Sequence, residues 1–141
     1  MIRLTLSACA MAVAAAVAPT RGTAPMKWTA TLAPQGSSKI AGTATVAPDG
    51  ASKMTVTVSI TGGDPNATYP WHVHTGKCTA GPVYGPGSAY KPIKADASGA
   101  GTVTVTVPVA SPESGDYHVN VHKSPSDMGT IVSCGELTMA M

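Results

Sequence analysis

The chain has 141 residues, only 11% of them are charged, and its formal net charge is +2. A chain of this length fits a single domain, and it carries no block of like charge that would follow a nucleic-acid backbone. Hydrophobic residues make up 43% and aromatic residues only 4%, which argues against disorder and for a core of aliphatic side chains. With 15 glycines and 12 prolines, the composition favours an all-β domain with many turns.

The N-terminal segment has the layout of a secretory signal peptide. Residues 1–3 form a short charged start, and residues 4–18 form an apolar, alanine-rich run without a charge. That run of about 15 residues is shorter than the roughly 20 that a membrane-spanning helix needs. We therefore expect a signal peptide over residues 1–24, cleaved between residues 16 and 24, and an exported domain over residues 25–141 without a membrane span. A retained N-terminal anchor is the alternative.

Two cysteines remain once the signal peptide, with Cys9, is removed. They are Cys78 and Cys134. An even pair in an exported chain predicts one disulfide, and two buried free thiols are the alternative. The disulfide would close a loop of roughly 60 residues, for which the chain-entropy treatment gives about 4 kcal/mol of stabilisation.

The exported part alternates apolar and polar residues in short segments, which is the periodicity of β-strands. This alternation, rich in β-branched residues, covers residues 28–32, 40–46, 54–60 and 102–109. Turns rich in glycine, proline and polar residues separate the segments. We predict an all-β fold, a Greek-key β-barrel or sandwich of seven to eight antiparallel strands. Residues 78–94 contain three prolines and three glycines and are expected to form an irregular loop, which the disulfide would tie to a last strand over residues 131–138.

The first pair of histidines lies in the segment Trp71-His72-Val73-His74. If Trp71 and Val73 point inward, His72 and His74 share the outer face of a strand. Two imidazoles spaced by two residues lie roughly 7 Å apart, and both can bind one metal ion at about 2 Å. Imidazole ligands suit copper and zinc rather than calcium or magnesium. The alternative is a pair of exposed surface histidines.

The second pair lies in residues 117–122, where the same alternation places His118, Asn120 and His122 on the outer face, toward solvent. A third histidine from this strand would complete a three-imidazole site. His118 and His122 are separated by roughly 13 Å along a strand, so the two cannot easily bind the same ion. His118 is expected to be a solvent-facing residue, and Asn120 a surface residue or a group that orients a ligand.

Four short motifs run in one order through the chain: His72-Val73-His74, Cys78 to Pro82, Val121-His122 and Ser133-Cys134-Gly135. In order and spacing they resemble the copper-zinc superoxide dismutase family. The strand segments before Trp71 match as well, so the resemblance covers nearly all of the exported chain. It implies an eight-stranded Greek-key β-barrel and a Cys78–Cys134 disulfide. It also implies copper bound by His72, His74 and His122.

Two functional positions of that family are replaced here. The family's fourth copper ligand, a histidine that also binds zinc, follows the Gly-Pro of the cysteine loop, where this chain has Val83. The family's remaining zinc ligands lie just beyond it, and residues 84–94 contain neither histidine nor aspartate. The arginine that attracts superoxide, three residues before the second cysteine, is Ile131 here. One copper ion per chain and no zinc are therefore expected.

From these features we expect an exported copper-binding protein, periplasmic or secreted, in which superoxide dismutation is weak or absent. Lys123 or Lys77 is a candidate for the missing positive charge, and the three copper ligands are the only candidates for catalysis. The first alternative is a functional copper-only superoxide dismutase that converts superoxide to oxygen and hydrogen peroxide. The second is a metal-free structural or interaction module. The expected partners are a copper ion and superoxide but no nucleic acid, and the family resemblance adds a homodimer.

Overall fold

The computed structural model describes residues 12–18, 26–78 and 81–140. Most of the expected signal peptide, including Cys9, lies outside these residues. The part of it that is described, residues 12–18, is exposed and forms neither a helix nor a strand. Within the described ranges, no helix is long and apolar enough to cross a membrane.

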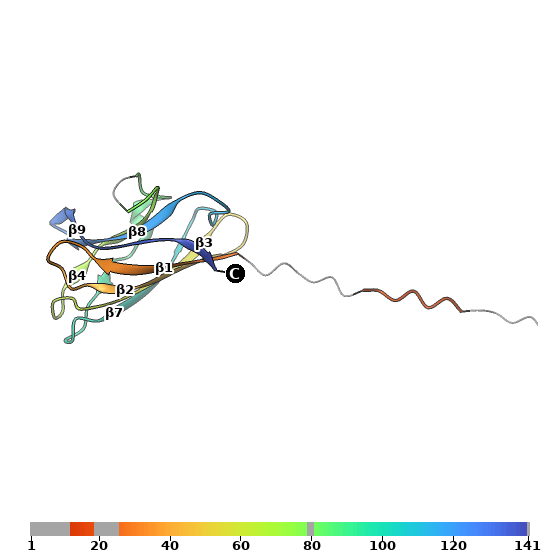
Figure 1. Ribbon diagram of the computed structural model, residues 1–141, viewed down its shortest axis with the longest axis horizontal. Coiled ribbons are helices and arrows are strands. Elements are labelled where there is room, and N and C mark those ends of the chain that lie inside the picture. The colour runs from red at the N-terminus through yellow and green to blue at the C-terminus, as the bar shows by residue number, and fades with distance from the viewer. Residues whose placement is uncertain (1–11, 19–25, 79–80, 141) are drawn as a thin grey trace, which may run out of the picture.

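Apart from one short 3₁₀ helix, the regular elements of the described body are all β-strands (Figure 1). In chain order the elements are β1 Lys27–Pro34, β2 Ala41–Pro48, β3 Met54–Thr61, β4 Thr68–Tyr69, β5 Trp71–Thr75, the 3₁₀ helix η1 Gly87–Ala89, β6 Ile93–Lys94, β7 Gly101–Val107, β8 Tyr117–Ser124, β9 Asp127–Glu136 and β10 Thr138–Ala140. The strands predicted from alternation over residues 28–32, 40–46, 54–60 and 102–109 correspond to β1, β2, β3 and β7 and are confirmed.

One antiparallel sheet of eight strands forms the body. Its order is β5-β8-β9-β1-β2-β3-β7, and β10 pairs with β1 off this path. Strands β1, β2 and β3 follow one another, whereas β9 arrives from the far end of the chain to lie beside β1. Such a return beside the first strand of a meander is typical of a Greek key. The sheet curls into a half-barrel (Figure 1), which confirms the predicted fold class.

Two segments differ in detail from the sequence prediction. The last strand was expected over residues 131–138, but β9 already begins at Asp127. The reason is a tight hairpin, in which the Asp127 amide donates a hydrogen bond to Ser124 Oγ at 3.1 Å. The irregular loop over residues 78–94 contains η1, and it ends in β6, which pairs with β4 in a separate two-stranded sheet.

The inward face of the strands that carry the histidines is anchored in the core. Trp71, Val73, Val119 and Val121 are each 0% exposed. The Trp71 indole Nε1 donates a hydrogen bond to the Lys91 carbonyl at 2.8 Å, so its one polar atom is satisfied. Burying a large apolar side chain stabilises the fold by about 1.5–3 kcal/mol. This anchoring fixes the register of β5 and β8 and turns their polar residues to the opposite face.

Candidate metal centre

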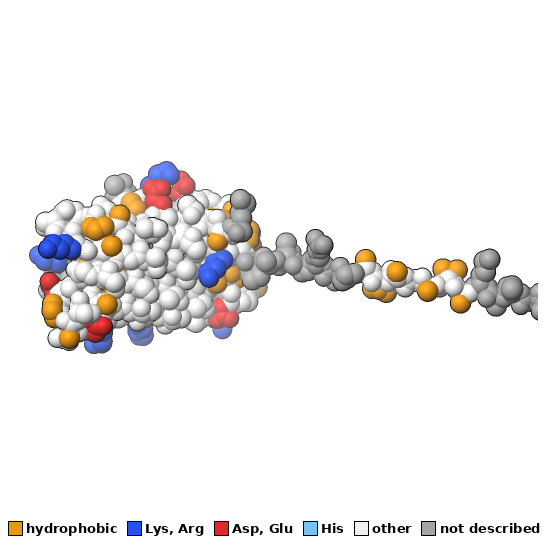
Figure 2. Space-filling view, turned by 60° about the horizontal axis from the view of Figure 1, so that its bottom comes forward, with side chains coloured by type: hydrophobic (Ala, Val, Ile, Leu, Met, Phe, Trp, Pro, Cys, Tyr) orange, Lys and Arg blue, Asp and Glu red, His pale blue; other side chains and the backbone are white. Residues whose placement is uncertain are grey.

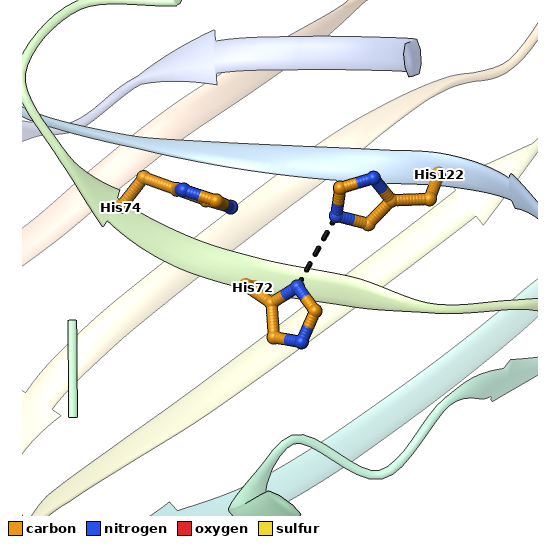
Figure 3. Close-up of side chains that lie close together, drawn as sticks. All are labelled: His72, His74 and His122. Carbon is orange, nitrogen blue, oxygen red and sulfur yellow. Dashed lines mark hydrogen bonds between the residues drawn. The ribbon is translucent and has the colours of Figure 1, made fainter. Parts of the chain in front are cut away.

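Three histidines from two neighbouring strands come together on that opposite face. His72 and His74 are on β5, and His122 is on β8, which pairs with β5 in antiparallel register. One ligand atom from each side chain lies within 4.8 Å of the others. Figure 3 shows the three side chains close together, with the contact between His72 and His122 marked. The three could hold a metal ion, as the sequence predicted.

Backbone carbonyls orient two of the three rings. His122 Nδ1 is 2.7 Å from the Met128 carbonyl oxygen, and His74 Nδ1 is 2.9 Å from the Gly81 carbonyl oxygen. A carbonyl only accepts, so each Nδ1 carries the hydrogen and each Nε2 keeps its lone pair. Metal-binding histidines are commonly held in this way through the nitrogen that does not bind the metal. Nε2 is therefore the ligand atom available from both rings.

His72 is turned the other way round. Its Nδ1 lies 3.1 Å from His122 Nε2, so Nδ1 is the nitrogen of His72 that faces the other two rings. Its Nε2 points toward Gly87, and a Cβ atom on that glycine would lie 3.8 Å from it. The Tyr90 ring packs edge-on against His72 at a centroid distance of 5.4 Å. Because His122 Nε2 carries no hydrogen, His72 Nδ1 donates one to it here, and that hydrogen would have to move to His72 Nε2 before Nδ1 could bind a metal. With that change the ligand set is one Nδ1 and two Nε2 atoms.

The electrostatics favour neutral imidazoles. Burial, followed by the neighbouring His122 and His74, lowers the pKa of His72 to about 4. Burial also lowers the pKa of His74, although the Gly81 carbonyl opposes this shift, and it lowers the pKa of His122 against the Met128 carbonyl. Metals bind the neutral form of histidine. These shifts keep the three rings ready to bind a metal near neutral pH without first losing protons.

The expectation that the polar face of β8 is exposed to solvent is wrong. His118 is 0% exposed, His122 is 6% exposed and Asn120 is 7% exposed. Alternation identified the correct face but not what covers it. The segments around Gly76 and Met128 lie over this face, and their carbonyls accept hydrogen bonds from His118 Nδ1 and His122 Nδ1. His118 is nevertheless outside the three-histidine group that the described residues form.

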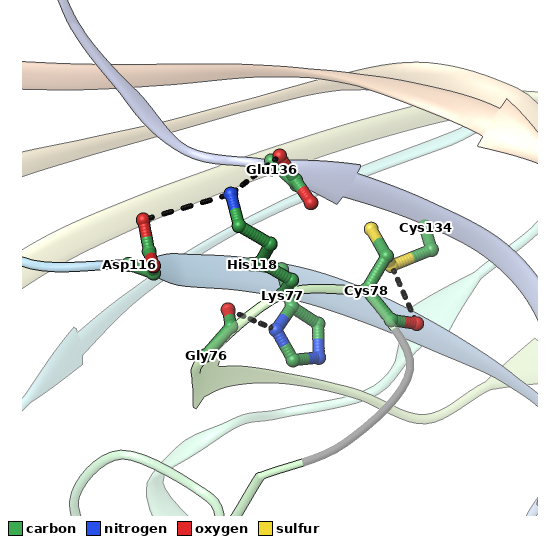
Figure 4. A network of polar contacts seen from close by, with 7 residues as sticks. All are labelled: Gly76, Lys77, Cys78, Asp116, His118, Cys134 and Glu136. Carbon is green, nitrogen blue, oxygen red and sulfur yellow. Dashed lines mark hydrogen bonds and ion pairs between the residues drawn. A yellow bond between two sulfur atoms is a disulfide. The ribbon is translucent and has the colours of Figure 1, made fainter.

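The two lysines named as replacements for the family's arginine have other surroundings. Lys77 Nζ lies 3.8 Å from Asp116 and 3.7 Å from Glu136, so two acidic groups already balance its charge (Figure 4). Lys123 is exposed and, with Lys39, lines a hollow of about 560 Å³. Within the described residues, none of the three histidines lines that hollow.

The two replaced family positions lie directly beside the ligand-bearing strands. Val83 forms an isolated antiparallel bridge with His74 and packs against the core. Ile131 is paired with His122 in the β8–β9 register. Neither side chain can bind a metal or carry a charge.

The predicted disulfide is confirmed. Cys78 and Cys134 are bonded, with their Cα atoms 6.0 Å apart, a common separation for a disulfide. The bridge attaches the segment after β5 to β9, on the same side of the sheet as the histidines. Figure 4 shows it next to His118.

Sequence reasoning missed the carbonyls of Gly81 and Met128 and the ring of Tyr90. Backbone carbonyls leave no trace in residue types, so no sequence signal could have shown them. A sequence signal did exist for Tyr90, because it is an aromatic residue inside a glycine- and proline-rich loop. Burial raises the pKa of Tyr90, and its hydroxyl donates a hydrogen bond to the Tyr84 carbonyl at 2.5 Å.

Comparison with known proteins extends the fold assignment only. No protein-family profile matches the sequence, and no curated protein matches it. A solved structure titled "Crystal Structure Analysis of the clock protein EA4" aligns with a TM-score of 0.62 and 18% sequence identity. The alignment covers 87% of this chain and 100% of that one. At this level of identity the similarity concerns the fold alone.

Proposed function

We propose that this protein is an exported copper-binding protein that holds one copper ion per chain through His72, His74 and His122. The proposal rests on one observation, the convergence of three neutral imidazoles. In His74 and His122 the ring nitrogen that faces away from the centre is fixed by a backbone carbonyl, and in His72 it points toward Gly87. His72 would contribute Nδ1, and His74 and His122 would contribute Nε2.

The donor set fits copper. His74 Nε2 is buried and has no hydrogen-bond partner among the described residues, as expected for an atom that serves as a ligand. Three imidazoles without a carboxylate or thiolate suit copper and zinc, and for equal ligands copper binds more tightly. Copper would supply one-electron chemistry at this site. The residues of the chain would hold it, orient it and limit its contact with water.

Export is supported by the disulfide and by the layout of the N-terminal segment. Disulfides persist in oxidising compartments and are rare in the cytosol. The Cys78–Cys134 bridge therefore agrees with a periplasmic or secreted protein.

Superoxide dismutation is proposed to be weak or absent. Fast turnover of an anion requires positive charge that guides it to the metal and a group that delivers protons. Val83 and Ile131 occupy the positions where the resembling family has a histidine and an arginine. Lys77 is paired with Asp116 and Glu136. A copper ion at this site would thus have neither the family's positive charge to guide superoxide nor its histidine to deliver protons.

Competitive metal loading followed by a rate measurement tests this proposal. Metal-free protein exposed to equal copper and zinc should retain copper, at one ion per chain, after gel filtration. Its rate with superoxide should lie far below the diffusion limit of about 10⁹ M⁻¹s⁻¹, and Ile131→Arg should raise that rate most at low salt. Retention of zinc, or of neither metal, would overturn the copper assignment. A near-limiting rate would instead identify a functional copper-only dismutase.

A further inference from the structure

His118 is a fully buried histidine that the three-histidine group does not include. It is 0% exposed, and its Nδ1 lies 2.7 Å from the Gly76 carbonyl oxygen (Figure 4). Its Nε2 is buried and has no hydrogen-bond partner in the described part of the chain. A buried imidazole with one nitrogen unsatisfied costs stability, so its place in the fold calls for a reason.

The ring of His118 is stacked on that of His74. The two residues are directly paired across β5 and β8, their ring centroids are 5.2 Å apart, and the ring planes differ by only 13°. The other two rings of the group are not stacked on His74. The plane of His72 makes an angle of 83° with that of His74, and the plane of His122 makes an angle of 58°. His118 therefore presents its flat face to one of the proposed ligands.

Both stacked rings are fixed in the same tautomer by the same stretch of chain. His118 donates through Nδ1 to the Gly76 carbonyl, and His74 donates through Nδ1 to the Gly81 carbonyl. Cys78, between these two glycines, is bonded to Cys134 on β9. The disulfide thus anchors the segment that sets the orientation of both rings.

We propose that His118 is a positioning residue for His74. It fixes the plane of the His74 imidazole, so that Nε2 is aimed at the metal, and it does so without binding the metal itself. A second effect follows once a metal is bound, because a metal-bound ring is electron-poor and is stabilised by the π-face of an aromatic neighbour. This inference rests on the proposed function and assigns a role to a residue that the superoxide dismutase resemblance leaves unassigned.

Three variants separate positioning from general stability. His118→Leu fills the space with an apolar side chain but removes the ring. His118→Phe keeps an aromatic ring but removes the Nδ1 hydrogen bond. Ser133→Ala is the matched control. It also removes one buried hydrogen bond, from Ser133 Oγ to the Ala33 carbonyl at 3.1 Å. We expect His118→Leu to weaken copper binding about tenfold, at the low end for residues that support a ligand. His118→Phe should lose less, and Ser133→Ala should bind as the parent does.

The electron paramagnetic resonance spectrum of the copper-loaded variants gives the readout that a purely structural role would not change. His118→Leu should shift the copper hyperfine splitting, and His118→Phe should restore most of it. If His118→Leu keeps the parental affinity and spectrum while losing stability, the positioning role is wrong.

A measurement on the metal-free parent keeps the test decisive if His118→Leu does not fold. In ¹⁵N NMR spectra, His74 and His118 should both carry a hydrogen on Nδ1, as their carbonyl partners require. A mixture of tautomers at either ring would contradict the fixed stack. If the parent binds no copper, the proposed function fails, whereas the NMR spectra still decide whether the two stacked rings are held in the fixed tautomers that the positioning role requires.

Discussion

Two parts of the same sheet share one sequence pattern but use their polar faces differently. Apart from Lys27, the polar residues of β1, β2, β3 and β7 are threonines and serines. Together with Thr138 of β10, one threonine from each strand forms a rank in direct register: Thr138, Thr29, Thr45, Thr57 and Thr104. Two of these hydroxyls, those of Thr57 and Thr104, are hydrogen-bonded to each other at 2.9 Å. These threonines, called the threonine half below, are exposed or half-buried.

On β5 and β8 four histidines and Asn120 share the polar face, and His118, Asn120 and His122 are buried. Segments beyond β5 and β8 pack over them and supply carbonyl acceptors, and the disulfide holds one of these segments in place. Figure 2 shows a different face, a broad expanse of uncharged side chains with lysine, aspartate and glutamate near its margins. In this view of the described residues no histidine is visible.

The comparison shows that alternation identifies the polar face of a strand but not whether solvent or another segment of the chain lies against that face. Hydroxyls on an exposed face need no cover. The Nε2 atom of His74 is buried without a hydrogen-bond partner among the described residues, a buried acceptor needs one, and a metal ion held with His72 and His122 is a partner that the geometry fits. The following predictions test this difference, from the largest expected effect to the smallest.

Removing one ligand should abolish stoichiometric metal binding. His122→Ala leaves two imidazoles, and we expect copper affinity to fall by more than about 100-fold, beyond the loss caused by removing a supporting residue. Isothermal titration of the metal-free protein measures it. Thr57→Ala, on the threonine half, is the control and should bind copper as the parent does. Parental affinity in His122→Ala would place the site elsewhere.

Removing the disulfide should cost more stability than any single change on the threonine half. The two cysteines are 56 residues apart in the chain, and for such a loop the double variant Cys78→Ala/Cys134→Ala should lose about 4 kcal/mol. Urea unfolding of the metal-free protein measures the loss. An unchanged midpoint would show that the covering segment does not depend on the bridge.

The three histidines of the candidate metal centre should also make the metal-free protein sensitive to acid. The pKa of His72 is lowered to about 4, and those of His74 and His122 are lowered as well. Between about pH 6.5 and pH 4 the unfolded chain binds a proton at His72 that the folded chain does not, and the lowered pKa values of His74 and His122 act in the same direction. Stability should therefore decrease as the pH falls through this window. His72→Gln should flatten the decrease, and an equally steep profile in that variant would contradict the assignment.

The smallest effect is expected on the threonine half. Thr104→Ala removes one exposed hydroxyl pair with Thr57 and should change the free energy of unfolding by less than about 1 kcal/mol. It should leave the pH profile and copper affinity unchanged. A loss as large as that from removing the disulfide would show that the hydroxyl rank stabilises the fold cooperatively.

Sequence reasoning reached the strands and two of the candidate ligands because both depend on local pattern, whereas His122 was singled out by the family resemblance. Period-two alternation located β1, β2, β3 and β7, and the His-x-His spacing placed His72 and His74 on one face. The burial of His118 and Asn120 could not be predicted in the same way, because it depends on segments distant in the chain that pack over β8. Nor could the carbonyls of Gly81 and Met128, since any residue type supplies the same carbonyl.

The most direct test of the central claim counts the nitrogen ligands of copper in the loaded protein. Copper should be added stepwise to the metal-free protein, and pulsed electron paramagnetic resonance should be recorded on the parent and on His72→Gln, His74→Gln and His122→Gln. The account predicts saturation at one copper ion per chain, three coordinated imidazoles in the parent and one fewer in each variant. Copper that binds without imidazole coordination, or with three imidazoles in all three variants, would contradict it.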